Sequence, residues 1–153
     1  GKVPVLIDGK AVVWDSLAIL EYLAEKNPKV WPTDSADRAR ARSVSAEMPA
    51  GFSPLRTHMS MNVRKRYPGK GRTPEVLEEI ARIESIWAQA KGPYLFGAFS
   101  AADAMYAPVV LRFRTYEVEL SNRAYMQAVL GLPAVDLGRV ESCAPPDRAD
   151  RAR

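Results

Sequence analysis

The sequence predicts an α+β fold that is mostly α, in which a strand hairpin and one helix precede an all-α bundle. Two short β-rich runs separated by an Asp-Gly dipeptide stand near the amino terminus. Beyond them, apolar residues recur at helical spacing between capping and proline signals. The 153 residues are 47% hydrophobic and 26% charged, which is the ordinary range for a globular chain that buries a core.

The first element is a β-hairpin with strands over residues 3–7 and 11–14. Asp8-Gly9 between them suits the positive φ angles of a tight turn, so the two strands should pair antiparallel. Pro4 opens the first strand, where it cannot donate to the ladder. The Val3-Pro4 bond is also a candidate for the cis form.

Asp15-Ser16 directly precedes a run of apolar residues at near-helical spacing, so one of these side chains should cap a helix. The free N–H groups of a first turn, with the helix dipole, favour a bound carboxylate or phosphate. Ser16 adds a hydroxyl donor and Asp15 adds an opposite charge, a combination that fits a zwitterionic amino-acid end. The simpler interpretation is an N-cap that contributes about 1 kcal/mol without any ligand.

Later helices are marked by their start and stop signals. A proline-containing linker is expected over 28–34, and a helix from about 35 should be kinked or split by Pro49 and Pro54. Thr73-Pro74-Glu75 should begin another helix. Its apolar stripe comprises Val76, Ile80, Ile83, Trp87 and Ala90.

The segment from Ala101 to about 118 is the most apolar, and we expect it to form the central helix. Ser100 and Asp103 stand where a capping box would satisfy two backbone donors. A last helix over about 122–130 should end at Gly131. The helical domain is therefore predicted over 35–135, with a disordered tail over 136–153.

Two groups of motifs resemble the glutathione transferase family. The first is Val3-Pro4, the Asp-Gly hairpin and Asp15-Ser16; the second is the run 93–106, which resembles the entry into the buried helix of the family's helical domain. The resemblance implies that residues 1–27 are the end of a thioredoxin-like glutathione-binding domain. The βαβ part of that domain, which carries the thiol-activating residue, is expected upstream of Gly1.

The resemblance also implies roles for individual residues. Glutathione, as co-substrate, would be held by Val3, Pro4, Asp15 and Ser16, and its thiolate would attack an electrophilic small molecule. The acceptor pocket would be lined by Met48, Phe52 and Tyr106, although such residues on amphipathic helices more often belong to the core. The activating residue, the class and the electrophile are not specified by these residues. This chain alone is expected to be inactive or impaired.

Two other functions compete with the enzyme. One is a non-catalytic dimerisation or scaffold domain, since homodimers are implied by the family. The other is nucleic-acid binding, for which the formal charge of +4 and a run of cations provide phosphate-binding groups without a recognised motif. These cations are Arg38, Arg40, Arg42, Arg56, Arg64, Lys65, Arg66, Lys70 and Arg72.

Several classes of site and location are disfavoured. The apolar runs are too short to span a bilayer and no signal peptide is recognisable, so a cytoplasmic protein without membrane partners is expected. The single cysteine, Cys143, cannot form an internal disulfide. His58 is the only histidine and has no ligand-spaced partner, so no metal site is expected.

Overall fold

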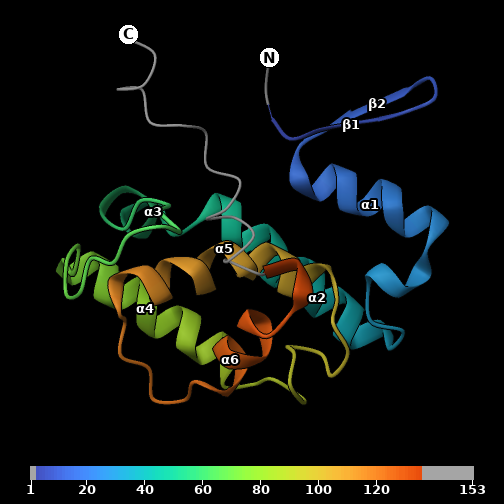
Figure 1. Cartoon of the computed structure of the whole chain (residues 1–153). Helices are drawn as coiled ribbons and strands as arrows, with labels where there is room; N and C mark the ends of the chain where they lie inside the picture. The colour runs from blue at the N-terminus through green and yellow to red at the C-terminus, as the bar shows by residue number, and fades with distance from the viewer. Residues whose placement is uncertain (1–2, 136–153) are drawn as a thin grey trace, which may run out of the picture.

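The computed structural model of the chain describes residues 3–135. Figure 1 shows the hairpin and helix α1 on one side of a bundle formed by α2 to α6, with α5 through its middle. This arrangement confirms the predicted α+β, mostly helical architecture. The tail over 136–153 and Cys143 lie outside the described residues.

The hairpin pairs β1 (Val5–Asp8) antiparallel with β2 (Ala11–Trp14), with Val5 opposite Trp14 and Asp8 opposite Ala11. The turn is therefore Gly9-Lys10 and not the predicted Asp8-Gly9. Gly9 has φ of 60°, the positive value that a two-residue hairpin needs at its first central position. Asp8 is therefore a paired residue of β1, and its side chain contacts residues of the helix that follows the hairpin.

Helix α1 (Ser16–Lys26) begins immediately after the hairpin, with Asp15 as its N-cap. It ends at Asn27, whose side chain caps the following 3₁₀ turn η1 (Pro28–Val30). Trp31 follows this turn and is buried in the core. The expected linker thus contains an ordered turn anchored by one large aromatic side chain.

The predicted split of the next helix is confirmed, but the break lies at Gly51-Phe52 and not at a proline. Helix α2 (Ser35–Ala50) contains Pro49 in its last turn, and α3 (Ser53–His58) has Pro54 in its first turn, where no N–H is needed. Phe52 between them has φ of 54°. The Arg56 guanidinium donates to the carbonyls of Met48 and Pro49, at the end of α2.

Helix α4 (Pro74–Trp87) starts with Thr73 as its N-cap, as predicted. Four of the five expected stripe residues are buried, but Ala90 follows the end of the helix and Ile86 is buried in α4 instead. The remaining elements are α5 (Ala101–Tyr116), α6 (Ala124–Leu130) and a final 3₁₀ turn η2 (Pro133–Val135).

The core is built around α5, which packs against α2 and α6. Tyr106 and Phe113 on this helix are fully buried, and both rings contact the ring of Trp87. These ring contacts join α4 to α5 in the core.

The predicted capping box opens α5, with Ser100 at the N-cap and Asp103 at the third helical position. Asp103 is fully buried, and its carboxylate accepts from the N–H of Leu95 at 3.0 Å and from the N–H and hydroxyl of Ser100 at 2.8 and 3.0 Å. Burial raises the pKa of Asp103 despite these hydrogen bonds. The carboxylate therefore joins the 93–100 loop to the central helix.

Candidate functional site

The candidate site is the amino-terminal end of α1, where Asp15 links it to β2. The Oδ1 atom of Asp15 accepts from the N–H of Leu17 at 2.9 Å and of Ala18 at 3.3 Å. Both bonds end on the same oxygen, so within the described residues Oδ2 keeps its lone pairs for another donor. Asp15 has φ of 75° and ψ of 134°, a conformation that residues other than glycine adopt at a cost in free energy.

Ser16 is the first residue of α1 and is only half-buried. Its side chain makes no hydrogen bond to another described residue. A hydroxyl and an N–H at this position both lie at the positive end of the helix dipole, where an anion is favoured. The predicted pair Asp15 and Ser16 therefore provides an acceptor next to donors on one exposed surface.

The hairpin brings the other two predicted residues to the same end of the molecule. Val5 pairs with Trp14, so the segment before β1 runs beside the segment that follows β2. Val3 is 90% exposed, and the Val3-Pro4 peptide bond is cis. The register thus places Val3, Pro4, Asp15 and Ser16 at one hairpin end, beside the start of α1.

The opposite end of the hairpin is attached to α1 by Asp8. Its carboxylate accepts from the Tyr22 hydroxyl at 3.0 Å and forms an ion pair with Lys26. The hydrogen bonds from Lys26 and Tyr22 lower the pKa of Asp8. These bonds hold the hairpin against the helix at the end away from the candidate site.

The three predicted acceptor-pocket residues lie in the core. Met48 is 7% exposed, Phe52 is 5% and Tyr106 is 0%. Tyr106 has no hydrogen-bond partner for its hydroxyl among the described residues, and burial raises its pKa. All three side chains pack in the bundle, and their role as pocket liners stays a prediction.

Several of the cations that suggested nucleic-acid binding form hydrogen bonds or ion pairs within the chain. Arg38 donates to the carbonyls of Pro32 and Thr33, and the Arg72 guanidinium donates to the carbonyl of Glu117. Arg42 pairs with Glu21, and Arg56 bonds the end of α2 as described. Of these four, only Arg42 is paired with a carboxylate, while Arg64, Lys65, Arg66 and Lys70 are exposed, so nucleic-acid binding stays the alternative that the sequence raised.

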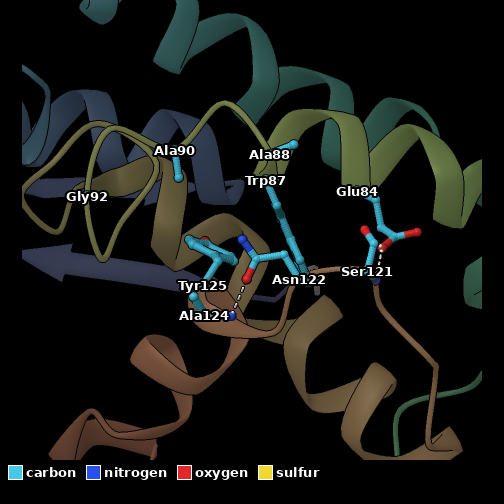
Figure 2. Close-up of a pocket in the computed structure, with 9 residues that line it drawn as sticks. All are labelled: Glu84, Trp87, Ala88, Ala90, Gly92, Ser121, Asn122, Ala124 and Tyr125. Carbon is cyan, nitrogen blue, oxygen red and sulfur yellow. Dashed lines mark hydrogen bonds between the residues drawn. The ribbon is translucent and has the colours of Figure 1, made fainter.

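Sequence reasoning did not identify the cavities on the bundle. One cavity of about 110 Å³ lies between the end of α4 and the start of α6, and its lining residues are drawn in Figure 2. Some of its polar groups bind one another: Glu84 accepts from the N–H and hydroxyl of Ser121, and Asn122 accepts from the N–H of Ala124, each at 2.8 Å. Two other lining residues, Trp87 and Tyr125, bury an indole N–H and a hydroxyl that have no hydrogen-bond partner among the described residues.

A larger cavity of about 330 Å³ lies along the linker, with Trp31, Phe96 and Phe99 among its walls. The signal for it in the sequence was the buried tryptophan of the linker, but its other walls come from a loop far along the chain. Among the described residues, no group of three or more His, Cys, Asp or Glu side chains could hold a metal ion. No described helix has the length and apolar character needed to cross a membrane.

Comparison with protein families and curated proteins gives consistent matches. Residues 1–25 match the model "Glutathione S-transferase, N-terminal domain", and residues 70–146 match "Glutathione S-transferase, C-terminal domain". The maleylacetoacetate isomerase of Rattus norvegicus is 32% identical over 95% of this chain and 70% of the rat protein. A probable maleylacetoacetate isomerase of Caenorhabditis elegans is 29% identical over 78% of this chain, which spans 59% of the nematode protein.

Solved structures show the same fold. A Burkholderia glutathione transferase homologue, crystallised with bound glutathione, superposes with a TM-score of 0.68 at 21% identity, over 94% of this chain and 75% of that one. Glutathione transferase Omega 3C of Trametes versicolor gives a TM-score of 0.64 at 25% identity, over 88% and 66% of the two chains. With the family models and the rat relative, these likenesses show that the chain belongs to the glutathione S-transferase family.

Proposed function

We propose that the amino-terminal end of α1 binds the γ-glutamyl end of glutathione, and that the chain is the glutathione-binding and helical part of a glutathione-dependent enzyme. The observation that carries this proposal is the pairing of free donors at Ser16 with the unused oxygen of Asp15 at one exposed helix end. The family membership of the chain supports the choice of ligand.

The two ends of an amino acid suit the two residues. The α-carboxylate would accept from the Ser16 hydroxyl and from the amide N–H at the start of α1. The α-ammonium would donate to Oδ2 of Asp15, since Oδ1 is used by the N–H groups of Leu17 and Ala18. The backbone of Val3, at the same hairpin end, would pair with the cysteinyl part of the tripeptide.

The proposed reaction is attack of the glutathione thiolate on an electrophilic carbon of a small molecule. A thiol with an ordinary pKa of about 8.5 is mostly protonated at neutral pH, so an additional donor must stabilise the thiolate. We assign no residue of this chain to that task. In a conjugation, the C–S bond forms as the carbon loses a leaving group with its electron pair, or as an activated double bond opens and its other carbon takes up a proton, and the thioether leaves as the product.

A second reaction is favoured by the names of the curated relatives, which are maleylacetoacetate isomerases. In a glutathione-dependent isomerisation the thiolate adds to a conjugated double bond, the new single bond rotates, and the thiolate leaves again. The two reactions are distinguished by the fate of glutathione, which is consumed in conjugation and regenerated in isomerisation. An assay that measures free thiol during turnover of the full-length protein separates them.

Isothermal titration of the chain with glutathione tests the binding site, and the chain contains a matched control. Ser16→Ala should weaken binding about tenfold, the effect expected for one hydrogen bond to a charged group. Ser35 also follows an N-cap aspartate and is the first residue of its helix, but it lies beside no hairpin. Ser35→Ala should leave the affinity unchanged, and equal effects of the two substitutions would refute the site.

A further inference from the structure

The connection between α3 and α4, residues 59–73, contains neither helix nor strand, yet α5 holds it in place. We call these residues the basic loop. The N–H of Tyr67 donates to the carbonyl of Thr115 at 2.7 Å, and the Thr115 hydroxyl donates to the carbonyl of Asn62. The rings of Tyr67 and Tyr116 lie with their centres 5.6 Å apart. These contacts fix the middle of the loop against the last turn of a core helix.

The end of the basic loop fits closely against α3. Gly71 has φ of 72°, and a Cβ atom at this position would lie 2.4 Å from the carbonyl oxygen of His58. Glycine alone allows both this conformation and this approach. The Arg72 guanidinium then donates to the carbonyl of Glu117 at 2.9 Å. The loop is therefore ordered before any partner binds, which removes one cost of association.

The basic loop accounts for the net positive charge of the whole chain. Residues 64–72 include five Lys or Arg and no Asp or Glu, which is a charge of +5. The chain has 22 basic and 18 acidic residues, so the rest of it has 17 against 18. No acidic residue stands between Glu47 and Glu75 in the sequence. Outside this segment the chain is close to neutral, so its excess charge gathers on one loop.

Most of these cations are exposed and unpaired. The Asn62 side chain accepts from the N–H groups of two consecutive loop residues, at 3.0 and 2.9 Å, which fixes the backbone where the cationic run begins. Among the residues that the structure describes, four cations of the loop are exposed and form no ion pair with a carboxylate: Arg64, Lys65, Arg66 and Lys70. Their charges are therefore available to an external anion.

The other side chains of the basic loop favour a phosphate partner over a protein partner. Protein interfaces depend on aromatic and apolar anchors, but the ring of Tyr67 is used against Tyr116 and the large apolar side chain that the loop exposes is Met61. A duplex nucleic acid carries one charge per about 1.7 Å of its axis and releases counterions when cations neutralise its phosphates. An ordered cluster of cations suits such a stiff, densely charged partner.

We propose that the basic loop binds duplex nucleic acid through the phosphate backbone, without reading the base sequence. The guanidinium groups of Arg64 and Arg66 can each bind two phosphate oxygens, and the Lys65 ammonium adds a point charge between them. The amide of Asn62 is used within the loop, by the bonds given above and by a bond from its Nδ2 to the Tyr67 hydroxyl at 3.3 Å. The inference does not depend on glutathione binding, because the candidate glutathione site lies on the hairpin and α1.

The experiment is fluorescence anisotropy of a labelled duplex of about 20 base pairs, titrated with the full chain between about 50 and 200 mM salt. The logarithm of the association constant should fall against the logarithm of the salt concentration with a slope of about −3 to −4, since each neutralised phosphate contributes about 0.9. Duplexes of unrelated sequence should bind equally. No binding, or binding that salt does not weaken, would overturn the inference.

Two triple variants with the same change in net charge separate the loop from the charge of the whole chain. The loop variant Arg64→Ser, Lys65→Ser, Arg66→Ser should bind at least about tenfold more weakly, with a slope reduced by about 2 to 3. The control variant replaces three exposed cations elsewhere, and it should change the affinity by less than about twofold. Its substitutions are Lys10→Ser, Lys29→Ser and Arg123→Ser. An equal loss in both variants would refute binding by the loop.

Two further measurements test the partner and the kind of contact. The variant Arg64→Lys, Lys65→Arg, Arg66→Lys keeps every charge, so it should keep the affinity within about twofold; a large loss would show that phosphate attraction is not the cause. Poly-glutamate with the same number of charges should compete at least about tenfold more weakly than unlabelled duplex, because its charges are less dense. Equal competition would assign the loop to acidic proteins and overturn the inference.

Discussion

Two helices of this chain begin with the same dipeptide, Asp-Ser, yet their starts differ in geometry. Asp34 precedes α2 with φ of −63°, and its carboxylate accepts from the N–H of Asp37. Asp15 precedes α1 with φ of 75° and accepts from two N–H groups through one oxygen. The dipeptide predicts a cap in both places, but only Asp15-Ser16 lies at a hairpin end.

The difference shows that the surroundings, and not the capping residues, define the candidate site. Asp34 follows a linker and adopts an extended conformation that any residue accepts. Asp15 follows a paired strand directly, and the chain turns from β2 into α1 within one residue at a positive φ. Strained conformations of this kind gather at binding sites. Removing a cap should therefore cost a different amount of stability at each helix start, according to its burial, strain and charge.

The largest expected effect concerns a third helix start, the buried cap of α5. Asp103→Ala would leave the N–H groups of Leu95 and Ser100 buried without partners, so we expect a loss of about 3 kcal/mol in the free energy of unfolding. Urea denaturation at neutral pH measures this loss. Ser100→Ala keeps the carboxylate and should cost about 1 kcal/mol; equal costs would show that the buried carboxylate has no special role.

The next effect separates strain from capping. Asp15→Ala loses the cap and keeps an unfavourable φ, whereas Asp15→Gly loses the cap and removes the strain. Asp15→Gly should therefore be more stable than Asp15→Ala by about 1 kcal/mol in thermal or urea unfolding. At Asp34, where φ is −63°, glycine gains no such relief. A similar gap between glycine and alanine at both positions would show that Asp15 is not strained.

The smallest effect is the pH dependence of the α2 cap. The hydrogen bond from the N–H of Asp37 lowers the pKa of Asp34 in the folded state. A lowered folded pKa stabilises the protein above the unfolded pKa of about 3.9, and this contribution is lost as pH falls through the folded pKa. Asp34→Asn should therefore reduce the loss of stability between pH 6 and about pH 3. Urea unfolding of the variant and the wild type at both pH values tests this prediction. An equal loss of unfolding free energy between the two pH values in both proteins would contradict it.

Local chemistry was sufficient for the parts of the fold that depend on neighbouring residues. The cap at Asp15 and the capping box of Ser100 and Asp103 each follow from residues within four positions of one another, and the hairpin follows from the short stretch 3–14. The turn was predicted one residue too early, because both Asp8-Gly9 and Gly9-Lys10 satisfy the turn preference and only the pairing of Asp8 with Ala11 decides.

Features that depend on distant residues could not be predicted in this way. The break at Gly51-Phe52 needs the Arg56 bonds to the end of α2, as well as the N–H of Leu55 donating to Glu79 at 2.7 Å. The contacts of Arg42 with Glu21 and Trp31 join three segments whose mutual approach no periodicity reveals. The core location of Tyr106 agrees with the simpler interpretation of its helix, but its edge contact with Trp87 depends on how the bundle brings α4 and α5 together.

The attachment of Asp8 to α1 has a consequence for how the chain acquires its shape. Its partners Tyr22 and Lys26 are only 14 and 18 positions away, whereas Tyr116 meets Ser60 across 56 positions. Closing short loops costs less chain entropy than closing long ones, and contacts near in sequence form sooner. We therefore expect the strand pair and its helix to assemble early, before the distant segments of the bundle meet.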